Sequence, residues 1–367
     1  MTNPRTSTSS PEIIKLTPPP RITKENYLGY NFGIRPYRKG GVRLERQNYR
    51  NKAIYHNYGH GGAGVSLAYG SARYIVDKFL ADTGESSRPD QVAVIGSGYM
   101  GLMEAIILTD LGYKVTVYAK AFPKEIGYHD DNEHCITSQV AGGLWLPYGI
   151  DLQDKPLHHK LGKETYEYYK KCIETKKYTA LTYKPIYLID SENPLPDYCH
   201  PGLIEYKNVK IDFGNGKLHD GVYWMTIMMD GDIFLKELSE EAKKKGVKFV
   251  KQNFEDILDI CELKEKYIFN CTGAYSRVLF NDLNIIPIAG HLIYVKKTPG
   301  CDYFLSAATK DGKYKVATYP QANKLAIGQA YEERGWIDKP DPEVLKRLST
   351  NLDELLEWRA GLPKPKL

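Results

Sequence analysis

Two glycine-rich turns, each running directly into a helical pattern, constrain this chain more than any other feature. The first is NYGHGGAGVSLAYGSA (residues 57–72) and the second is VAVIGSGYMGLMEA (residues 92–105). A turn of this kind lets the backbone approach a ligand closely and leaves free N–H groups at the start of the helix. The fold must therefore contain two such close approaches, encoded near each other in the sequence.

The second turn has the context that binding of a dinucleotide requires. An apolar strand precedes Gly96, Gly98 and Gly101, a helix that ends at Gly112 follows them, and the strand KVTVYAK (114–120) comes next. A strand–helix–strand unit of this kind places its two strands side by side and parallel. In such a unit the first glycine permits the turn, the second admits a pyrophosphate and the third lets helix and strand pack closely.

The residue expected to hold a ribose is not acidic in this chain. The strand after the glycine turn ends at Lys120, and an ammonium group cannot accept a hydrogen bond from a ribose hydroxyl. It can instead meet a phosphate. The glycine motif alone therefore leaves FAD, NADP and an unusual adenosine pocket open.

Composition and charge exclude several other classes of protein. The chain has 367 residues, enough for two domains, and its net charge is only +5 with the basic residues scattered. We therefore expect no nucleic-acid binding, and no apolar run is long enough to span a membrane. The polar segment HDDNEHC (129–135) fits no metal-ligand spacing, so we expect no metal, and we interpret His158 and His159 as surface residues.

Taken together, the motifs resemble those of the D-amino-acid oxidase family of flavoproteins. The stretch HNYGHGGAGVSLAYGSA is similar to the family signature almost residue for residue, and GIRPYRKGGVRLERQ is similar to the segment that precedes it. The blocks VAVIGSGYMG, VYAKAF, SQVAGGLWLPY, GVKFVKQNFEDI and NCTGAYS resemble the other conserved parts. The resemblance covers most of residues 21–367.

The order of these blocks differs from that of the family. There the dinucleotide fold opens the chain and the NYGHGG block closes it, whereas here the closing block comes first. We therefore expect a circular permutation, with the new ends between LLEWRAGLPKPKL and RITKENYLGY.

The resemblance implies an α/β fold with two domains. One is a Rossmann-type FAD-binding domain with a parallel sheet, and the other is an α+β substrate domain with a mainly antiparallel sheet. The expected ranges are 1–20 for a mobile N-terminal tail, 36–147 and 224–290 for the FAD-binding domain, and 21–35, 148–223 and 291–367 for the substrate domain.

Functional roles are carried over from the family by position. The implied catalytic residues are Arg35 as the clamp for the substrate carboxylate, the Gly62 carbonyl as acceptor from the amine, and Tyr148, Tyr314 and Tyr319 around the pocket. The implied FAD-binding residues are Gly61, Gly62, Gly64, Val65, Ser66, Gly96, Gly98, Gly101, Lys120, Thr137, Ser138, Gly143, Leu144 and Phe254.

Three positions depart from the family pattern. Besides Lys120, a pocket tyrosine of the family falls on Ala317, although Tyr319 lies two residues away on the same strand face. The lid tyrosine of the family falls on Tyr314, in a lid segment, 300–317, that is shorter than in the family. The lid lysines Lys310, Lys313 and Lys315 would attract an acidic substrate, or would simply be solvated.

The resemblance implies FAD-dependent oxidative deamination of a small D-amino acid. The products would be an imino acid, which hydrolyses to a 2-oxo acid and ammonia, and hydrogen peroxide. We rank neutral D-amino acids first, D-aspartate or D-glutamate second and glycine-type amines third. A flavin-dependent dehydrogenase or biosynthetic amine oxidase and a degenerate protein without flavin are the alternatives.

The expected partners are the amino-acid substrate and oxygen, with no nucleic acid and no membrane, and homodimer formation stays open. The six cysteines have no CxxC spacing, which favours a reducing compartment and a cytoplasmic location. The terminal PKL is a poor match to a peroxisomal address.

Overall fold

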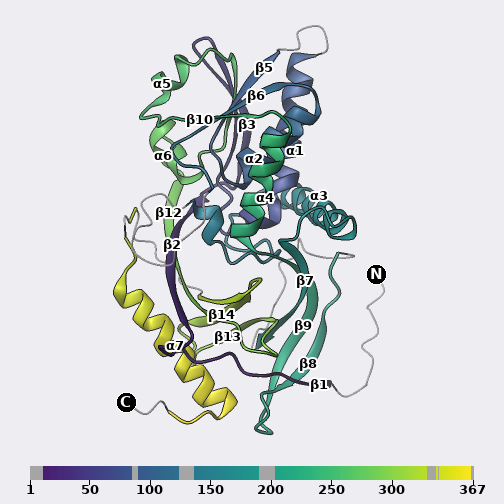
Figure 1. Ribbon diagram of the computed structural model, residues 1–367, viewed down its shortest axis with the longest axis vertical. Helices are drawn as coiled ribbons and strands as arrows, with labels where there is room; N and C mark the ends of the chain where they lie inside the picture. Colours follow the sequence, from purple (N-terminus) through teal and green to yellow (C-terminus); the bar gives the residue numbers. More distant parts are fainter. Residues whose placement is uncertain are drawn as a thin grey trace.

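Two sheets with helices around them make up the computed structural model (Figure 1). It describes residues 11–84, 90–123, 136–189, 203–328, 336–337 and 339–364. The mixed α/β class predicted from the sequence is confirmed, with one largely parallel and one largely antiparallel sheet.

The smaller sheet is the Rossmann-type part of the fold. Its six strands stand in the order β10 (Lys248–Lys251), β6 (Lys114–Ala119), β5 (Gln91–Ile95), β11 (Tyr267–Asn270), β4 (Lys52–Tyr58) and β3 (Arg43–Tyr49). All neighbours are parallel except β3 and β4, which form a hairpin. The strands β5, β11 and β4 therefore point their carboxyl ends at one edge, where both glycine turns begin.

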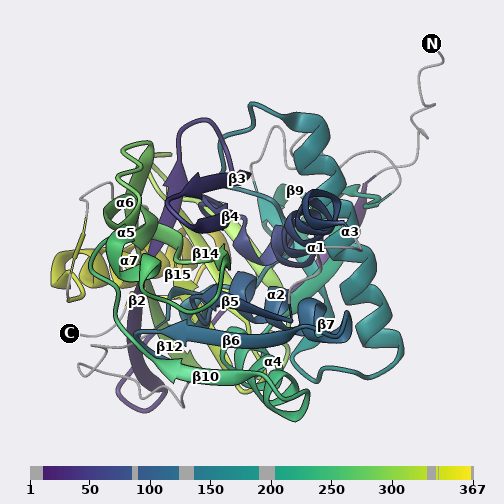
Figure 2. The same ribbon diagram turned by 90° about the horizontal axis from the view of Figure 1, so that it is seen from above.

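Helices cover the smaller sheet and end where the sequence predicts. The helix α1 (Gly64–Thr83) ends at Gly84, and α2 (Tyr99–Asp110) ends just before Gly112. The helix α3 (Lys155–Glu174) packs beside α1, as the view from above shows (Figure 2), and α4 (Gly231–Lys244) packs on α2. Short helices α5 (Ile257–Cys261) and α6 (Ser276–Leu279) flank β11.

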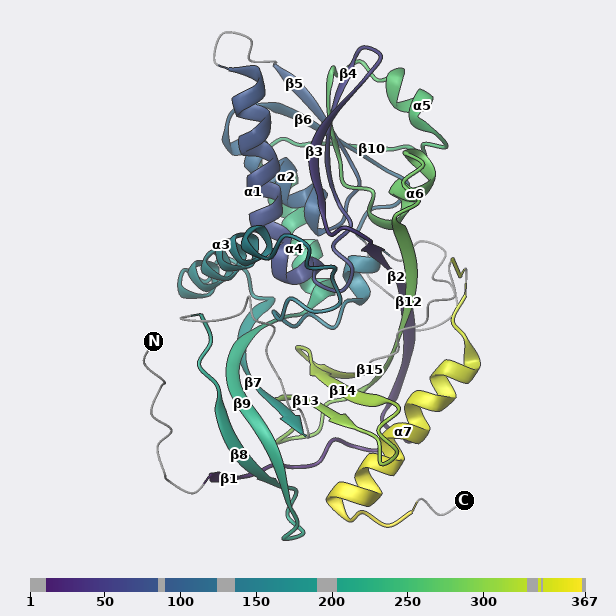
Figure 3. The ribbon, with the colours of Figure 1, turned by 180° about the vertical axis from the view of Figure 1, so that it is seen from behind.

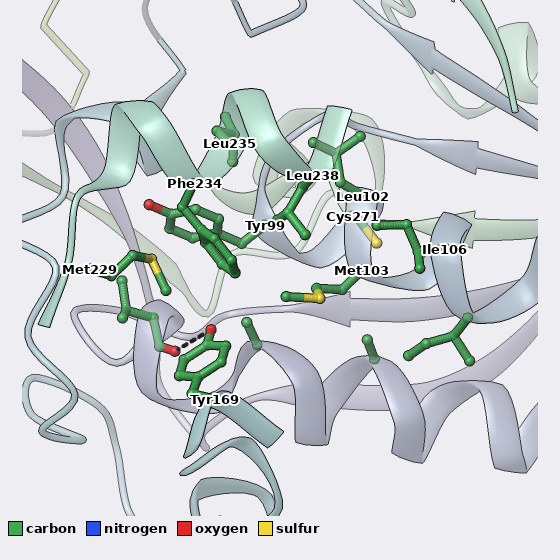
Figure 4. Close-up of a cluster of buried hydrophobic side chains, with 14 of the residues drawn as sticks. Tyr99, Leu102, Met103, Ile106, Tyr169, Met229, Phe234, Leu235, Leu238 and Cys271 are labelled. Atoms are coloured by element: carbon green, nitrogen blue, oxygen red, sulfur yellow. Dashed lines mark hydrogen bonds between the residues drawn. The ribbon is translucent and has the colours of Figure 1, made fainter. Parts of the chain in front are cut away.

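A buried apolar cluster fixes these helices against the sheet (Figure 4). Phe234 and Leu238 of α4 pack on Leu102 and Met103 of α2, and all four are at most 1% exposed. The apolar residues of α2 face both the sheet and α4, which explains why its sequence is apolar on all sides.

The larger sheet is a nine-stranded, mainly antiparallel wall. Its strands stand in the order β1 (Glu12–Lys15), β8 (Lys207–Asp212), β9 (Leu218–Met229), β7 (Leu181–Ile189), β13 (Phe304–Ala308), β14 (Lys315–Pro320), β15 (Lys324–Gly328), β12 (Ile285–Lys296) and β2 (Tyr27–Arg38). Only the β1–β8 and β7–β13 pairs are parallel.

The long strands β2 and β12 join the two parts of the molecule. They run side by side from the smaller sheet down one edge of the larger sheet (Figure 3), and their pairing extends from Tyr27 to Arg38 of β2. This antiparallel ladder fixes the position of β2 relative to both sheets.

The helix α7 (Pro342–Ala360) packs its leucine face, including Leu352 and Leu356, on the outside of the larger sheet. Beside it, the Arg21 guanidinium lies 2.6 Å from Asp353 and donates a 2.7 Å hydrogen bond to the Pro363 carbonyl. The segment that precedes β2 therefore adjoins the second half of α7 and the residues that follow it.

Two expectations are wrong. Residues 12–15, expected within a mobile tail, form β1, and Ile14 packs against the core of the larger sheet. His158, interpreted as a surface residue, is only 2% exposed, because it lies on the face of α3 that carries Leu161 and Thr165. Adjacent helical residues point about 100° apart, so one of two neighbouring histidines can be buried.

The expected domain boundaries at 35/36, 223/224 and 290/291 each fall inside a strand of the larger sheet, namely β2, β9 and β12. In the part of the chain that the structure describes, no helix is long and apolar enough to cross a membrane.

Candidate cofactor and substrate site

One cavity of about 870 Å³ lies between the two sheets and contains most of the predicted site residues. Its lining includes both glycine-rich turns, the ends of β5, β6 and β11, and the inner faces of β2, β12 and β14. A volume of this size falls in the range of small-molecule and cofactor sites.

The second glycine turn is shaped by contacts that only glycine allows. Gly96 has φ +111°, and a β-carbon there would lie 2.4 Å from the Cys271 carbonyl oxygen. At Gly101 a β-carbon would lie 2.0 Å from the Gly96 carbonyl oxygen. The missing side chains let α2 start directly at the end of β5, so its first turn faces the cavity.

The first glycine turn lies in the same cavity. The Gly61 amide donates to the Pro36 carbonyl, and the Gly62 amide donates to the Gly149 carbonyl, both at 2.9 Å. These bonds fix the NYGHGG block to β2 and to the segment that carries Tyr148. The fold thus places the two turns in the lining of a single cavity.

The short helix η1 (Thr137–Val140) provides hydroxyl groups between the two turns. The Ser138 hydroxyl lies 3.3 Å from the amide of Tyr99, the first residue of α2. The Thr137 hydroxyl donates to the Ile34 carbonyl of β2 at 3.2 Å. Anions bind well where such hydroxyls and helix N–H groups meet.

Arg35 reaches the cavity from β2, and Gly290 of β12 makes room for it. A β-carbon at Gly290 would lie 2.2 to 2.6 Å from the Arg35 guanidinium atoms. The guanidinium therefore lies directly on the backbone of β12, and Arg35 lines the cavity. A planar fork held in this way can bind a carboxylate through two hydrogen bonds.

The structure brings together all but three of the predicted site residues. Those that line the cavity are Arg35, Gly61, Gly62, Gly64, Val65, Gly96, Gly98, Lys120, Thr137, Ser138, Gly143, Leu144, Tyr148, Phe254 and Tyr319. Gly101 and Ser66 are buried just behind the lining.

Tyr314 lies outside the cavity. It is 43% exposed, and its ring packs under the Arg347 guanidinium of α7 at 5.0 Å. The expected lid tyrosine is thus held by α7 and does not face the site. The segment 129–135 lies outside the described residues.

The described lining carries cations and no acidic residue. Arg35, Lys120, Lys155 and Lys315 contribute to it, and no Asp or Glu does. Such a surface favours anionic ligands, since field lines concentrate in a cavity with low-dielectric walls.

A buried carboxyl group lies directly behind the lining. Glu104 of α2 accepts a 2.6 Å hydrogen bond from the Asn57 amide and a 2.9 Å hydrogen bond from the Cys271 thiol. Complete burial raises the pKa of Glu104 to about 8, and the two hydrogen bonds oppose this rise. Burial also lowers the pKa of His60 to about 3, with a smaller effect of His158.

Sequence reasoning missed Gly290 and Glu104. Gly290 stands in an apolar strand pattern without any turn signal, so only its pairing with β2 shows its role. For Glu104 a signal existed, because it is the one charged residue within the apolar stretch LMEAIIL.

Comparison with known proteins decides the family. A model of the family described as FAD dependent oxidoreductase matches residues 91–362, about three quarters of the chain. The chain belongs to this FAD-dependent oxidoreductase family. Residues 1–90, which contain the NYGHGG turn, stand before the matched range.

Curated relatives in the family agree with this assignment. The D-amino-acid oxidase of Streptomyces coelicolor is 26% identical over 262 residues, 71% of this chain and 76% of that protein. The D-amino-acid oxidase of Dictyostelium discoideum is 26% identical over 265 residues, 70% and 71% of the two chains. Among solved structures, the glycine oxidase of Bacillus cereus shares the fold, with a TM-score of 0.52 at 15% identity over 71% of this chain and 76% of that chain.

The site fits the cofactor of the family. The turn at Gly96 and Gly98 has no side chain to block a diphosphate, and the hydroxyl of Ser138 and the ammonium group of Lys120 are donors to anions. The protein is an FAD-dependent, amino-acid-oxidase-like enzyme with FAD as its cofactor.

Gly101→Ala tests the glycine cradle. The added carbon meets the Gly96 carbonyl at 2.0 Å and must push α2 away from β5. We expect the free energy of unfolding to fall by about 1–3 kcal/mol. The ratio of flavin to protein absorbance after purification should fall severalfold.

Gly162→Ala on α3 is the control, since its new carbon makes only ordinary contacts at 3.7 Å or more. The variant should keep its flavin and full stability. Normal flavin content in Gly101→Ala would contradict the proposed packing of α2.

Glu104→Gln tests the buried carboxyl group. An acid whose pKa is raised on folding binds its proton more tightly in the folded state, so stability falls as the pH rises from about 5 to about 8. The variant keeps a similar shape without an ionisable group. Its free energy of unfolding should exceed that of the wild type by a few kcal/mol at pH 8, with a much smaller gain at pH 5. The free energies of unfolding are measured by urea denaturation. If those of the wild type and the variant changed with pH in parallel, this result would contradict the raised pKa of Glu104.

Proposed function

We propose that this protein catalyses the FAD-dependent oxidative deamination of a small D-amino acid. The products are an imino acid, which hydrolyses to a 2-oxo acid and ammonia, and hydrogen peroxide formed from oxygen. The observation that carries the proposal is the position of the Arg35 guanidinium, which lies on Gly290 in the same cavity as both glycine turns. The family and the curated relatives support the general reaction.

We assign the residues that line the cavity to two roles, binding of the cofactor and binding of the substrate. The backbone at Gly96 and Gly98, with Thr137 and Ser138, would hold the pyrophosphate of FAD. Gly143, Leu144 and the segment 61–66 would lie along the flavin ring. When bound, FAD supplies the acceptor for the two electrons removed from the substrate.

Arg35 would bind the substrate carboxylate as a bidentate fork. The Gly62 carbonyl would accept a hydrogen bond from the substrate amine. With the carboxylate and the amine both fixed, the α-hydrogen would point toward the cofactor in one enantiomer and away from it in the other. The geometry would therefore distinguish the two enantiomers.

Tyrosine side chains would limit the size of the substrate. The Tyr319 ring lies against the backbone of Gly142, where a β-carbon would be 2.5 Å away, and contacts Phe304 with ring centroids 5.0 Å apart. Tyr148 lines the opening and is 48% exposed. The packed Tyr319 ring would limit the space on one side of the substrate, and the exposed Tyr148 would flank it on the other. Such a site suits a small amino acid.

We also propose that the chain is a circular permutation of the family pattern and that the two parts of the fold are the expected FAD-binding and substrate domains. Residues 43–58 complete the smaller sheet although they precede the range that the family model matches. Arg21 and Pro363, which flank the proposed new ends, are in contact. The homodimer and the cytoplasmic location stay predictions.

Arg35→Ala tests the carboxylate clamp. Loss of a charged, buried hydrogen-bonding partner costs about 2–5 kcal/mol, so kcat/KM for D-alanine should fall at least 30-fold, mainly through KM. Peroxide release is measured with D- and L-alanine.

Arg73→Ala, which removes an exposed arginine of α1, is the control and should leave turnover unchanged. Equal efficiency of Arg35→Ala and the wild type would contradict the assignment. Turnover of L-alanine in preference to D-alanine would contradict the D-specificity. Substrate oxidation without peroxide would favour a dehydrogenase, and a protein purified without flavin would favour the degenerate alternative.

A rearranged chain tests the permutation. It begins at Asp90, runs to Pro363, continues through a short flexible linker to Arg21 and ends at Gly84. Because Arg21 and Pro363 already touch, we expect this chain to fold, bind FAD and keep kcat/KM within about threefold of the original. A matched chain with the same linker but a break inside α2 should not fold. A chain in the original order that also lacks residues 1–20 controls for the loss of β1. Failure of the rearranged chain to fold where this control folds would contradict the proposal.

A further inference from the structure

We propose that Lys315 binds a second carboxylate, so that acidic D-amino acids are the preferred substrates of this site. This inference rests on the proposed function and narrows its substrate class. It reverses the ranking that the sequence alone favours, which places neutral D-amino acids first.

The structure separates the three lysines of the expected lid. Lys313 is exposed and pairs with Asp311, and the amide of Lys310 donates to Glu354 of α7. Neither residue lines the cavity, whereas Lys315, at the start of β14, does. Within the described part of the chain, no hydrogen bond or ion pair involves the Lys315 side chain.

The pairing of strands places Lys315 on the same face of the larger sheet as Arg35. The strands β14 and β12 both run antiparallel to β15, so they run parallel to each other. Ala317 pairs with Gly328, and a β-carbon at Gly328 would lie 2.3 Å from the Leu292 side chain. These three residues therefore form one row across the sheet.

The next row along the same face contains Lys315 and Gly290. Lys315 lies two residues before Ala317 on β14, and Gly290 lies two residues before Leu292 on β12. The guanidinium of Arg35 lies over Gly290. Two strand spacings separate the backbones of β14 and β12, which is about 10 Å. The two cations thus approach the cavity from opposite sides of this row.

A dicarboxylate fits this pair of charges. The planar Arg35 fork suits the carboxylate next to the amine, and the compact ammonium group of Lys315 suits a carboxylate at the end of a flexible side chain. The described lining contains no Asp or Glu. Lys315 is exposed at the start of β14, so its flexible ammonium group can reach a substrate carboxylate in the cavity that it lines, whereas a neutral side chain offers it no charged partner.

The test compares each acid with its amide in three forms of the FAD-loaded enzyme. kcat/KM is measured for D-aspartate against D-asparagine and for D-glutamate against D-glutamine. The forms are the wild type, Lys315→Met and the control Lys313→Met, which removes an exposed lysine of the same hairpin. We expect the wild type and the control to prefer the acids at least tenfold. Lys315→Met should lose this preference while turnover of the amides stays within about twofold.

A binding measurement makes the test independent of turnover. Succinate and butyrate differ by one carboxylate, and their binding to the FAD-loaded protein is followed by the change in the flavin spectrum. We expect the wild type to bind succinate at least tenfold more tightly and Lys315→Met to bind both equally.

The outcomes separate the two proposals. Oxidation of D-alanine without any preference for acids, or an unchanged preference in Lys315→Met, overturns the role of Lys315 and leaves the proposed function standing. Absence of oxidation with every D-amino acid overturns the proposed function and the substrate class with it. Equal binding of succinate and butyrate by the wild type overturns the second carboxylate site directly.

Discussion

The antiparallel contact between β2 and β12 is the interaction on which the site depends. It extends over the full length of β2 and carries Arg35 to a position where its guanidinium lies on Gly290. Any side chain at Gly290 would displace that guanidinium. The Pro36 and Ile34 carbonyls of β2 also accept hydrogen bonds, from the Gly61 amide of the first glycine turn and from the Thr137 hydroxyl. The same strand therefore fixes the substrate anchor relative to the cofactor cradle.

This arrangement does not depend on the order in which the pieces are joined. The first glycine turn follows β4, the second follows β5, and β11 separates these two parallel strands in the sheet. Packing requires only that β4, β11 and β5 lie side by side with their carboxyl ends at one edge. A chain in which β2 and β4 precede β5 can therefore build the same cavity, provided that the two segments joined in the other order lie close together, as Arg21 and Pro363 do.

Local signals in the sequence predicted the elements and much of the site, whereas long-range contacts were needed for the rest. The helices after both turns and their ends at Gly84 and near Gly112 follow from glycine placement and apolar spacing. The pairing of β1 with β8, the room that Gly290 provides and the burial of His158 depend on distant segments, and no local pattern encodes them. Tyr314 and Lys315 are adjacent, and only the sheet decides which one faces the cavity.

The central claim is that both glycine turns and Arg35 enclose one flavin next to one substrate. It is tested most directly by the absorption spectrum of the purified protein when D-alanine or D-aspartate is added without oxygen. We predict a flavin spectrum that loses its long-wavelength band with the D-enantiomer, keeps it with the L-enantiomer and regains it when air is admitted. A purified protein with a flavin spectrum that neither D-amino acid changes would contradict the claim.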